Sequence, residues 1–417
     1  MNSDRLVAGL DIGSSKTTAI IGEVVGDLPK HPSIKVLGVG QARTTGMRRG
    51  VVADIEETTR SIRKAIQDAE RMAGVQIQEV YAGIAGEHVA AMTSKGIVAV
   101  SGEEINKSDV SRANEVARAQ AIPAERELLH AIPQEYTVDK NAGIRDPIGM
   151  SGTRLETEMY LVTIGSSPAV NLRKSVERAG YAVRELVLEP LASALAVLTE
   201  DEKELGTALV EMGAGTTDLA VFQEGKIRHL GTIAFGGNNV TNDIVHGLGV
   251  TQADAERLKE RYGCAYEPLV SSNDVIQLPS TVAQGDRQIP RELLAHIIHM
   301  RMEEIFDLVQ REISTAGYAG KLSAGMVLTG GAAAMQGSAE LASDVFGTGV
   351  RVGVPIENLT GLSDSVEAPR FSTAVGLAQY GGSRIALGAL GSARTSKMRS
   401  GIAGAVDRLK LLLQDFW

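Results

Sequence analysis

Two short glycine turns contain residue types suited to binding a polyphosphate. The first turn lies in LDIGSSKTTAII (residues 10–21) and the second in VEMGAGTTDLAVF (residues 210–222). The residues that align without a gap are Asp11, Gly13 and Thr17 in the first turn and Glu211, Gly213 and Thr217 in the second. Glycines let backbone N–H groups approach an anion closely, and a carboxylate beside them can hold a metal ion through water.

Either turn alone is typical of an ordinary β-hairpin. Two copies with acidic residues at matching positions instead favour two related lobes, each of which carries one turn. Two such turns that face each other across a cleft could hold a nucleotide from both sides. The repeat therefore predicts nucleotide binding.

A third glycine motif, GMVLTGGAAAMQG (residues 325–337), combines an apolar strand with Gly330, Gly331 and a row of alanines. Because no bulky side chain follows the glycines, a flat base could lie against this backbone. Other nucleotide motifs are missing, since the sequence has neither a Walker G-x-x-x-x-G-K-[ST] nor a G-x-G-x-x-G that opens a βαβ unit.

The segments that must position these motifs alternate between predicted strands and helices. Two β-branched apolar runs surround the first turn, and Asp54 is a plausible N-cap of an amphipathic helix over residues 54–73. The pattern changes between about residues 83 and 160, which indicates an inserted subdomain. Residues 381–401 are rich in Gly, Ser and Ala and are predicted to be a flexible linker.

Composition excludes several classes of protein. An apolar content of 43% with 22% charged residues is ordinary for a globular α/β protein, and the net charge of −9 argues against bulk nucleic-acid binding. The single cysteine, Cys264, excludes an internal disulfide. Charged residues interrupt the N-terminus, so no signal peptide is expected, and no apolar run approaches the roughly 20 residues of a membrane span. We expect a cytoplasmic protein.

The last 16 residues, IAGAVDRLKLLLQDFW, have the spacing of an amphipathic helix. On a helix most of its apolar residues fall within an arc of about 140°, and Leu411 is the one large apolar exception. The apolar residues expected to touch a membrane are Ile402, Val406, Leu409, Leu412, Leu413, Phe416 and Trp417. Periodicity alone fits a helix docked on its own core equally well, but the preceding predicted linker favours a membrane interface.

The order of motifs resembles the actin, heat-shock-chaperone and sugar-kinase ATPase superfamily. The motifs are the two turns, LEPLASALAVL (188–198), GGAA, and FSTAVGLAQYG (371–381). Within it, the chain is most similar to the FtsA family of bacterial cell-division actin homologues. The segments that carry this resemblance are GLDIGSSK, GMRRGVV, GCAYEPLV, GMVLTGGAAAMQG, NLTGLSD and the C-terminal amphipathic segment.

The resemblance implies an actin-like two-lobed α/β ATPase fold with ATP and Mg2+ in the cleft, an inserted subdomain in the N-lobe and a C-terminal amphipathic helix. Asp11 would hold Mg2+ through water, and Glu189 and Glu211 are the candidate catalytic residues. The residues implied to line the phosphates are Gly13, Ser14, Ser15, Lys16, Gly213, Gly215, Thr216 and Thr217. Those implied near the ribose and base are Gly236, Gly237, Glu256, Lys259, Gly330, Gly331 and Ala332.

The second turn departs from the superfamily, because Glu211 stands where an aspartate is usual. A displacement near 1 Å can cost roughly 10²-fold in rate, so nucleotide binding is a firmer expectation than hydrolysis. A slow ATPase remains an open possibility.

The domain layout implied by the resemblance has six parts. They are the N-lobe core (1–82, 163–200 and 370–380), the inserted subdomain (83–162), the C-lobe core (201–240 and 321–369), the C-lobe accessory subdomain (241–320), the linker (381–401) and the membrane helix (402–417).

The implied partners are the C-terminal tail of the tubulin-like protein FtsZ, further copies of the chain in a filament, later division proteins and membrane lipid. Arg301 is the residue expected to contact the FtsZ tail. The implied location is the cytoplasmic face of the bacterial membrane at the division site. The alternative is a soluble ATPase or a small-molecule kinase on the same fold. A kinase usually needs an aspartate base in the cleft, which no sequence motif clearly supplies.

Three further features have two interpretations. Arg48 and Arg49 in GMRRG could bind phosphate or a partner, although the residue types alone favour a solvated turn. His296 and His299 have metal-ligand spacing, but the sequence offers no third ligand, so a helix surface is favoured. Cys264 is expected to be structural, because no base motif marks it.

Overall fold

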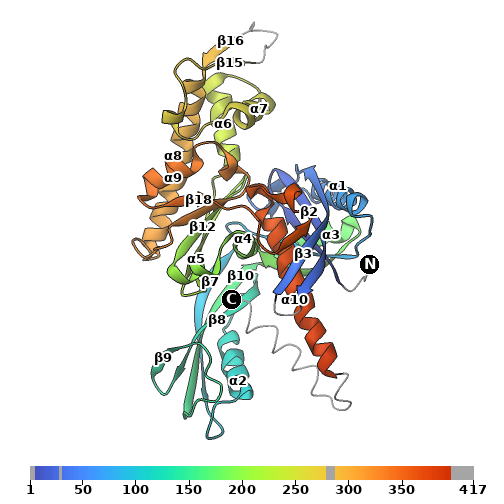
Figure 1. Cartoon of the computed structure of the whole chain (residues 1–417), viewed down its shortest axis with the longest axis vertical. Coiled ribbons are helices and arrows are strands. Elements are labelled where there is room, and N and C mark those ends of the chain that lie inside the picture. Colours follow the sequence, from blue (N-terminus) through green and yellow to red (C-terminus); the bar gives the residue numbers. More distant parts are fainter. Residues whose placement is uncertain (1–4, 28–30, 279–286, 396–417) are drawn as a thin grey trace.

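The computed structural model describes residues 5–27, 31–278 and 287–395. They form two lobes that each contain a mixed sheet, with an inserted subdomain at the bottom and an accessory subdomain at the top of the view in Figure 1. The α/β architecture agrees with the expectation from the sequence. No described helix has both the length and the apolarity to cross a membrane.

The N-lobe core is a six-stranded sheet with the order β11-β6-β1-β2-β3-β19. The strands are β1 (Leu6–Ile12), β2 (Lys16–Asp27), β3 (His31–Arg43), β6 (Glu79–Ile84), β11 (Ala182–Leu188) and β19 (Leu359–Gly361). A short hairpin of β4 (Met47–Arg48) and β5 (Val51–Val52) follows β3. The predicted strand–turn–strand unit around the first glycine turn is the β1–β2 hairpin.

Helices cover both faces of this sheet. One face packs on α1 (Ile55–Ala73) and α3 (Ser166–Ala179) through a core that includes Ile62, Ile66 and Val176. The other face packs on α4 (Glu189–Val197) and α10 (Ser372–Thr395). The predicted helix at 54–73 is confirmed, because Asp54 caps α1 by accepting a 2.9 Å hydrogen bond from the Glu57 N–H.

The C-lobe sheet repeats the N-lobe topology. Its order is β14-β13-β12-β17-β18, and its strand directions match those of β3-β2-β1-β6-β11. The strands are β12 (Thr207–Met212), β13 (Thr217–Gln223), β14 (Lys226–Ile233), β17 (Met326–Thr329) and β18 (Val350–Val352). Each lobe thus contains an antiparallel three-stranded unit followed by two parallel strands, as the sequence repeat predicts.

The accessory subdomain and the remaining short helices surround the C-lobe sheet. These elements are α5 (Glu200–Leu205), α6 (Gly237–Leu248), α7 (Gln252–Tyr262), η2 (Glu267–Leu269), β15 (Val275–Leu278), β16 (Arg287–Pro290), α8 (Arg291–Thr315), η3 (Ala332–Ala334), α9 (Ser338–Phe346), η4 (Ser363–Val366) and η5 (Pro369–Phe371). One continuous core joins α6, α7 and α8 to the sheet, and buries Ile244, Leu258 and Phe306.

The inserted subdomain is a separate four-stranded sheet with the order β7-β10-β8-β9, covered by one helix. Its elements are β7 (Ala90–Ala99), α2 (Lys107–Arg118), β8 (Arg126–Val138), β9 (Asn141–Ile144) and β10 (Arg154–Gly165). Its own small core includes Val110, Tyr136 and Leu155. The change in sequence pattern after residue 83 marks this insertion.

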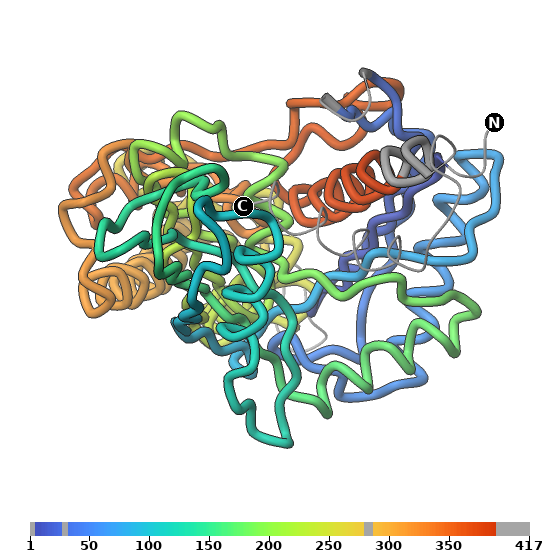
Figure 2. Tube along the Cα trace, turned by 90° about the horizontal axis from the view of Figure 1, so that it is seen from below, coloured from blue at the N-terminus to red at the C-terminus, as the bar shows by residue number. Residues whose placement is uncertain are grey.

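The predicted linker is wrong over residues 381–395, because helix α10 continues to Thr395. Its small residues allow close packing on the N-lobe sheet: a Cβ on Gly381 would lie 2.5 Å from the Tyr81 ring, and one on Gly382 would lie 2.5 Å from Ile34. Figure 2 shows α10 in red beside the blue N-lobe strands. Residues 396–401 and the predicted membrane helix at 402–417 lie outside the described residues.

Candidate nucleotide site between the two lobes

The two glycine turns have the same local structure. In the first hairpin Asp11 pairs with Thr18, and in the second Glu211 pairs with Asp218. Each turn is closed by the same backbone hydrogen bond, from the Gly13 N–H to the Lys16 carbonyl at 3.1 Å and from the Gly213 N–H to the Thr216 carbonyl at 2.9 Å. The turns therefore correspond residue by residue in three dimensions.

The tips of the two turns meet between the lobes. A Cβ built on Gly215 would lie 2.6 Å from Ser14 Oγ and 3.1 Å from the Arg49 backbone nitrogen. Real Cβ atoms do not approach other atoms to 2.6 Å, so only glycine permits this contact. The structure thus brings both predicted phosphate turns to one place.

Four acidic side chains gather behind the turns. They are Asp11 on β1, Glu189 at the start of α4, Glu211 on β12 and Asp218 on β13. Burial raises the pKa of Asp11 to about 7, that of Glu211 to about 8 and that of Asp218 to about 6. Burial, and then the charges of Asp11 and Glu211, also raise the pKa of Glu189 well above its usual range.

Hydrogen bonds fix Glu211 and Asp218 in place. Glu211 Oε1 accepts a hydrogen bond from Thr373 on α10, whereas its buried Oε2 has no partner among the described residues. Asp218 accepts hydrogen bonds from Thr232 at 2.7 Å and from Thr216 at 3.0 Å. The acidic cluster therefore spans both lobes.

This donor set fits a hard cation that keeps its water shell. Among the described residues, no three His, Cys, Asp or Glu side chains converge closely enough to hold a metal ion directly. Mg2+ retains several waters and uses one or two carboxylates beside phosphates, so the orphaned Glu211 Oε2 and the raised carboxyl pKa values favour a hydrated cation here.

The first turn of helix α6 lies against the second glycine turn. The Gly237 N–H donates to the Gly213 carbonyl at 3.0 Å, and Asn238 N–H donates to Ala214 at 2.8 Å. A Cβ on Gly237 would lie 3.5 Å from Ala332 Cβ and 3.6 Å from Lys259 Nζ. The predicted ribose and base residues of α6, α7 and η3 are therefore neighbours.

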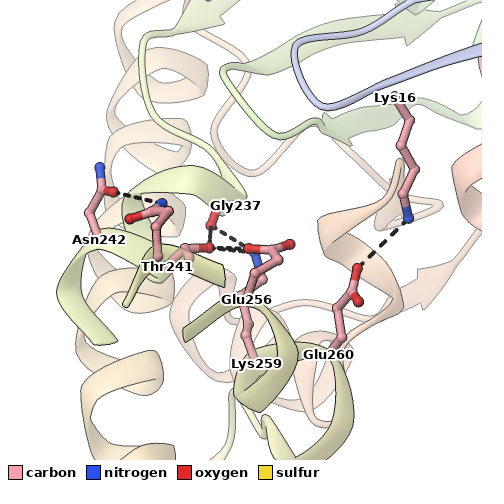
Figure 3. A network of polar contacts seen from close by, with 8 residues as sticks. Lys16, Gly237, Thr241, Asn242, Glu256, Lys259 and Glu260 are labelled. Atoms are coloured by element: carbon pink, nitrogen blue, oxygen red, sulfur yellow. Dashed lines mark hydrogen bonds and ion pairs between the residues drawn. The ribbon is translucent and has the colours of Figure 1, made fainter. Parts of the chain in front are cut away.

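Lys259 and Glu256 form a compact polar group with α6 (Figure 3). The Lys259 ammonium donates to the Gly237 carbonyl at 3.0 Å, to Thr241 at 2.7 Å and to Glu256 at 2.8 Å. Lys259 is mostly buried, with 11% of its side chain exposed. The pair is thus positioned by the N-terminus of α6.

The third glycine motif presses its backbone on strand β12. Gly330 has a φ of +87°, and a Cβ there would lie 2.5 Å from the Met212 carbonyl oxygen. Gly331 is exposed and open, which leaves a flat backbone surface beside Ala332. Both features suit the predicted base site.

Lys16 and Glu260 connect the lobes at the mouth of this region. Their Nζ and Oε1 atoms are 3.7 Å apart, and both side chains are more than half exposed (Figure 3). This ion pair joins the first turn to α7.

Several other sequence predictions are now placed. Arg301 on α8 pairs with Asp243 and Glu304. His296 contacts Glu267 and His299 contacts a backbone carbonyl, so neither forms a metal site among the described residues. The sequence prediction did not include Asp218, although it follows the aligned Thr217 directly. Ser193 and Thr373, which are 3.1 Å apart, lie in two of the motifs that carry the resemblance but were not singled out.

Two family models match the chain. The model described as "Cell division protein FtsA" matches residues 208–376, and "SHS2 domain inserted in FTSA" matches residues 86–163. The second match falls on the inserted subdomain predicted at 83–162.

Curated relatives cover most of the chain. The cell division protein FtsA of Pseudomonas aeruginosa is 44% identical over 381 residues, which cover 91% of this chain and 90% of the relative. FtsA of Escherichia coli strain K12 is 40% identical, with 90% of each chain covered. FtsA of Bacillus subtilis strain 168 is 39% identical, with 91% of this chain and 84% of the relative covered.

Solved structures share the fold at low identity. The PilM-PilN type IV pilus biogenesis complex has a TM-score of 0.63 at 17% identity and covers 90% of this chain and 98% of that chain. MreB5 of Spiroplasma citri bound to ADP has a TM-score of 0.52 at 15% identity and covers 90% and 95%. The MamK double helical filament has a TM-score of 0.51 at 14% identity and covers 90% and 98%. The fold is therefore actin-like.

Proposed function

The chain belongs to the FtsA family of cell division proteins, and from this premise we propose that it binds ATP with Mg2+ between its lobes, polymerises, and anchors FtsZ filaments to the cytoplasmic membrane. Later division proteins would bind partly through the inserted subdomain. The observation that carries the nucleotide proposal is the tip-to-tip meeting of two matching glycine turns above a buried acidic cluster.

Each part of the site has a proposed role. The free N–H groups of the turns, with Ser14, Ser15, Lys16 and Thr216, would bind the phosphates. Asp11 would hold hydrated Mg2+, which neutralises phosphate charge when it is bound. Lys259 and Glu256 would contact the ribose, and the base would lie on Gly331 and Ala332. These proposed contacts surround one continuous region of the two lobes.

Hydrolysis has weaker support than binding. A group that positions an attacking water must accept its proton, yet burial raises the pKa of Glu211 to about 8, so this carboxyl holds a proton near neutral pH until a cation is present. We propose Glu189 and Glu211 as the residues that would orient the water. Slow turnover is the expected result.

Membrane attachment would come from residues 402–417, which lie outside the described part of the chain. A single short amphipathic helix binds membranes weakly and reversibly. A filament presents many such helices together, so avidity would make attachment firm. Avidity in the filament would thus link the three proposed properties of the chain: nucleotide binding, polymerisation and membrane binding.

The FtsZ tail is proposed to dock on the accessory subdomain. Arg301 stays our candidate contact, but its ion pairs with Asp243 and Glu304 already use much of its donor capacity. An acidic tail would therefore have to replace or extend these pairs.

A soluble ATPase or small-molecule kinase is the alternative on the same fold. Asp218 supplies a buried aspartate in the cleft, so the absence of such a residue is no longer an argument against a kinase. The family membership favours the division role.

Co-sedimentation with anionic vesicles tests the proposal. The full chain should pellet with vesicles, and more strongly with ATP, whereas a chain that ends at Ser400 should stay in solution. If both chains stay in the supernatant under all conditions, the membrane role is wrong. Transfer of labelled phosphate from ATP to a sugar would instead support the kinase.

A further inference from the structure

A cavity of about 440 Å³ lies where the two lobes meet. Its walls come from four segments: the first glycine turn, the β4–β5 hairpin, the second glycine turn and the first two turns of helix α6. The lining residues are Ser14, Met47, Arg48, Arg49, Gly215, Asn238, Asn239 and Asn242.

The cavity lining combines arginine and asparagine side chains with Met47 and the two turn tips. None of the described residues that line it is acidic. Arg48 and Arg49 are exposed, and neither forms an ion pair or a side-chain hydrogen bond within the described part of the chain. The three asparagines, in the first two turns of α6, add amide groups to the same lining near the positive end of that helix.

The backbone that carries the arginines is held firmly. Arg49 has a φ of +48°, a conformation that a non-glycine residue rarely adopts and that tends to be retained at functional sites. The Gly50 N–H lies 3.4 Å from Ser14 Oγ, and a Cβ on Gly50 would lie 2.5 Å from the Ala85 carbonyl oxygen. The hairpin is thus fixed to the first turn and to the end of β6, while its arginine side chains have no partner among residues 5–27, 31–278 and 287–395.

The position of the cavity relative to the nucleotide site identifies the anion. Gly237, Lys259 and Ala332 mark the base end of the site, on one side of the second turn. Ser14 and Gly215 lie where the tips of the two turns meet, and both residues line the cavity, as do Asn238 and Asn239 after Gly237. A nucleotide with its base on Gly331 and Ala332 and its phosphates between the two turns would bring its last phosphate to the turn tips, which form part of the cavity wall.

We propose that Arg48 and Arg49 bind the terminal phosphate of ATP and so make the site prefer ATP to ADP. This inference rests on the proposed nucleotide function and adds the residues that distinguish the two nucleotides. ADP ends one phosphate short of the cavity, so it gains little from the arginines. The guanidinium groups bind phosphate through charge-assisted, bidentate hydrogen bonds.

Equilibrium binding to the full chain tests this proposal, with Mg2+ present and with ADP and a non-hydrolysable ATP analogue as ligands. The double variant Arg48→Ala/Arg49→Gly removes both charges, and glycine suits the positive φ at position 49. The matched charge-keeping variant is Arg48→Lys/Arg49→Lys. Arg311→Ala, an exposed arginine of α8 outside the cavity, is the control.

The double variant should lose about 10- to 100-fold in affinity for the ATP analogue, while its ADP affinity changes by less than about threefold. The lysine variant should retain part of the preference, and Arg311→Ala should retain all of it. An unchanged ratio of the two affinities in the double variant overturns the proposal. If the double variant binds neither nucleotide, the single variants Arg48→Ala and Arg49→Gly are measured instead. The ratio of their affinities for the ATP analogue and for ADP then tests the proposal.

Two further outcomes separate the possible failures. If the unmodified chain binds neither nucleotide, the proposed nucleotide function fails, and this inference fails with it. Inorganic phosphate is the last probe. If it binds the unmodified chain but not the double variant, and if its presence does not change the affinity for the ATP analogue, the cavity is an independent anion site and the proposal is wrong.

Discussion

Replacement of Glu211 by glutamine should change how the stability of the chain depends on pH. Burial, with a smaller contribution from the charges of Asp218 and Asp11, raises the pKa of this carboxyl from its ordinary 4.5 to about 8. The folded chain therefore keeps a proton that the unfolded chain has lost over roughly pH 4.5 to 8. The destabilisation is absent below that window, grows as the pH rises through it and is complete above it.

The size of this destabilisation follows from the one proton that the folded chain holds on Glu211 and the unfolded chain has lost. One proton lowers the free energy of unfolding by about 1.4 kcal/mol per pH unit, so a rise from about pH 5.5 to about pH 7.5 costs about 2 to 3 kcal/mol through Glu211 alone. Glu211→Gln removes this contribution and still accepts the hydrogen bond from Thr373. Relative to the unmodified chain, the variant should gain about 2 to 3 kcal/mol between the two pH values.

Urea unfolding without nucleotide, followed by circular dichroism at both pH values, measures this difference. Asp11, Glu189 and Asp218 remain in both proteins, and because the charge of Glu211 raises the pKa of Glu189, the difference reports Glu211 together with this coupling. Glu177→Gln, at an exposed position on α3, serves as control and should shift stability equally at both pH values. A difference between Glu211→Gln and the unmodified chain that is the same at both pH values would refute a buried, protonated Glu211.

Two other substitutions test the packing and the closure of the lobes. Gly376→Ala should destabilise the chain by about 1 to 3 kcal/mol or more in the same unfolding assay, because its Cβ would lie 1.7 Å from the Ala192 carbonyl oxygen where α10 crosses α4. Gly388→Ala on the same helix meets nothing within 4 Å and should be neutral or slightly stabilising; equal effects at both glycines would contradict this packing. Glu260→Gln breaks the exposed 3.7 Å pair with Lys16, so stability should change by less than about 1 kcal/mol. Release of a fluorescent ADP, followed by stopped-flow displacement, should nevertheless become several-fold faster, and an unchanged release rate would show that the pair does not hold the cleft closed.

Local patterns predicted the hairpins and the first helix. The two glycine turns aligned without a gap, and their β-branched flanks form the β1–β2 and β12–β13 hairpins in matching register. Asp54 caps α1, as its position before the amphipathic run indicates. These features depend on neighbouring residues, which is why the sequence alone reveals them.

Features that depend on distant contacts were not predictable in the same way. Gly381 and Gly382 suggest flexibility when read locally, yet both lie within α10. Glycine is required there because Tyr81 and Ile34 leave no room for a larger side chain. Thr373 reaches Glu211 across 162 residues of sequence. Spacing along the chain carries no information about either contact.

The arginines of GMRRG show the same limit at the site. The residues alone favoured a solvated turn over a site for phosphate or a partner. The cavity, its lining and the positive φ of Arg49 favour the second interpretation. The arginines suggested anion binding from their residue type. Only the three-dimensional structure shows that they lie beside the two glycine turns.

Recruitment of FtsZ filaments to anionic vesicles tests the central proposal most directly. With the full chain and ATP present, FtsZ should sediment with the vesicles, and it should remain in solution when the chain ends at Ser400 or is left out. If FtsZ sediments equally without the full chain, or stays in solution although the chain itself binds the vesicles, the proposed anchoring role is wrong.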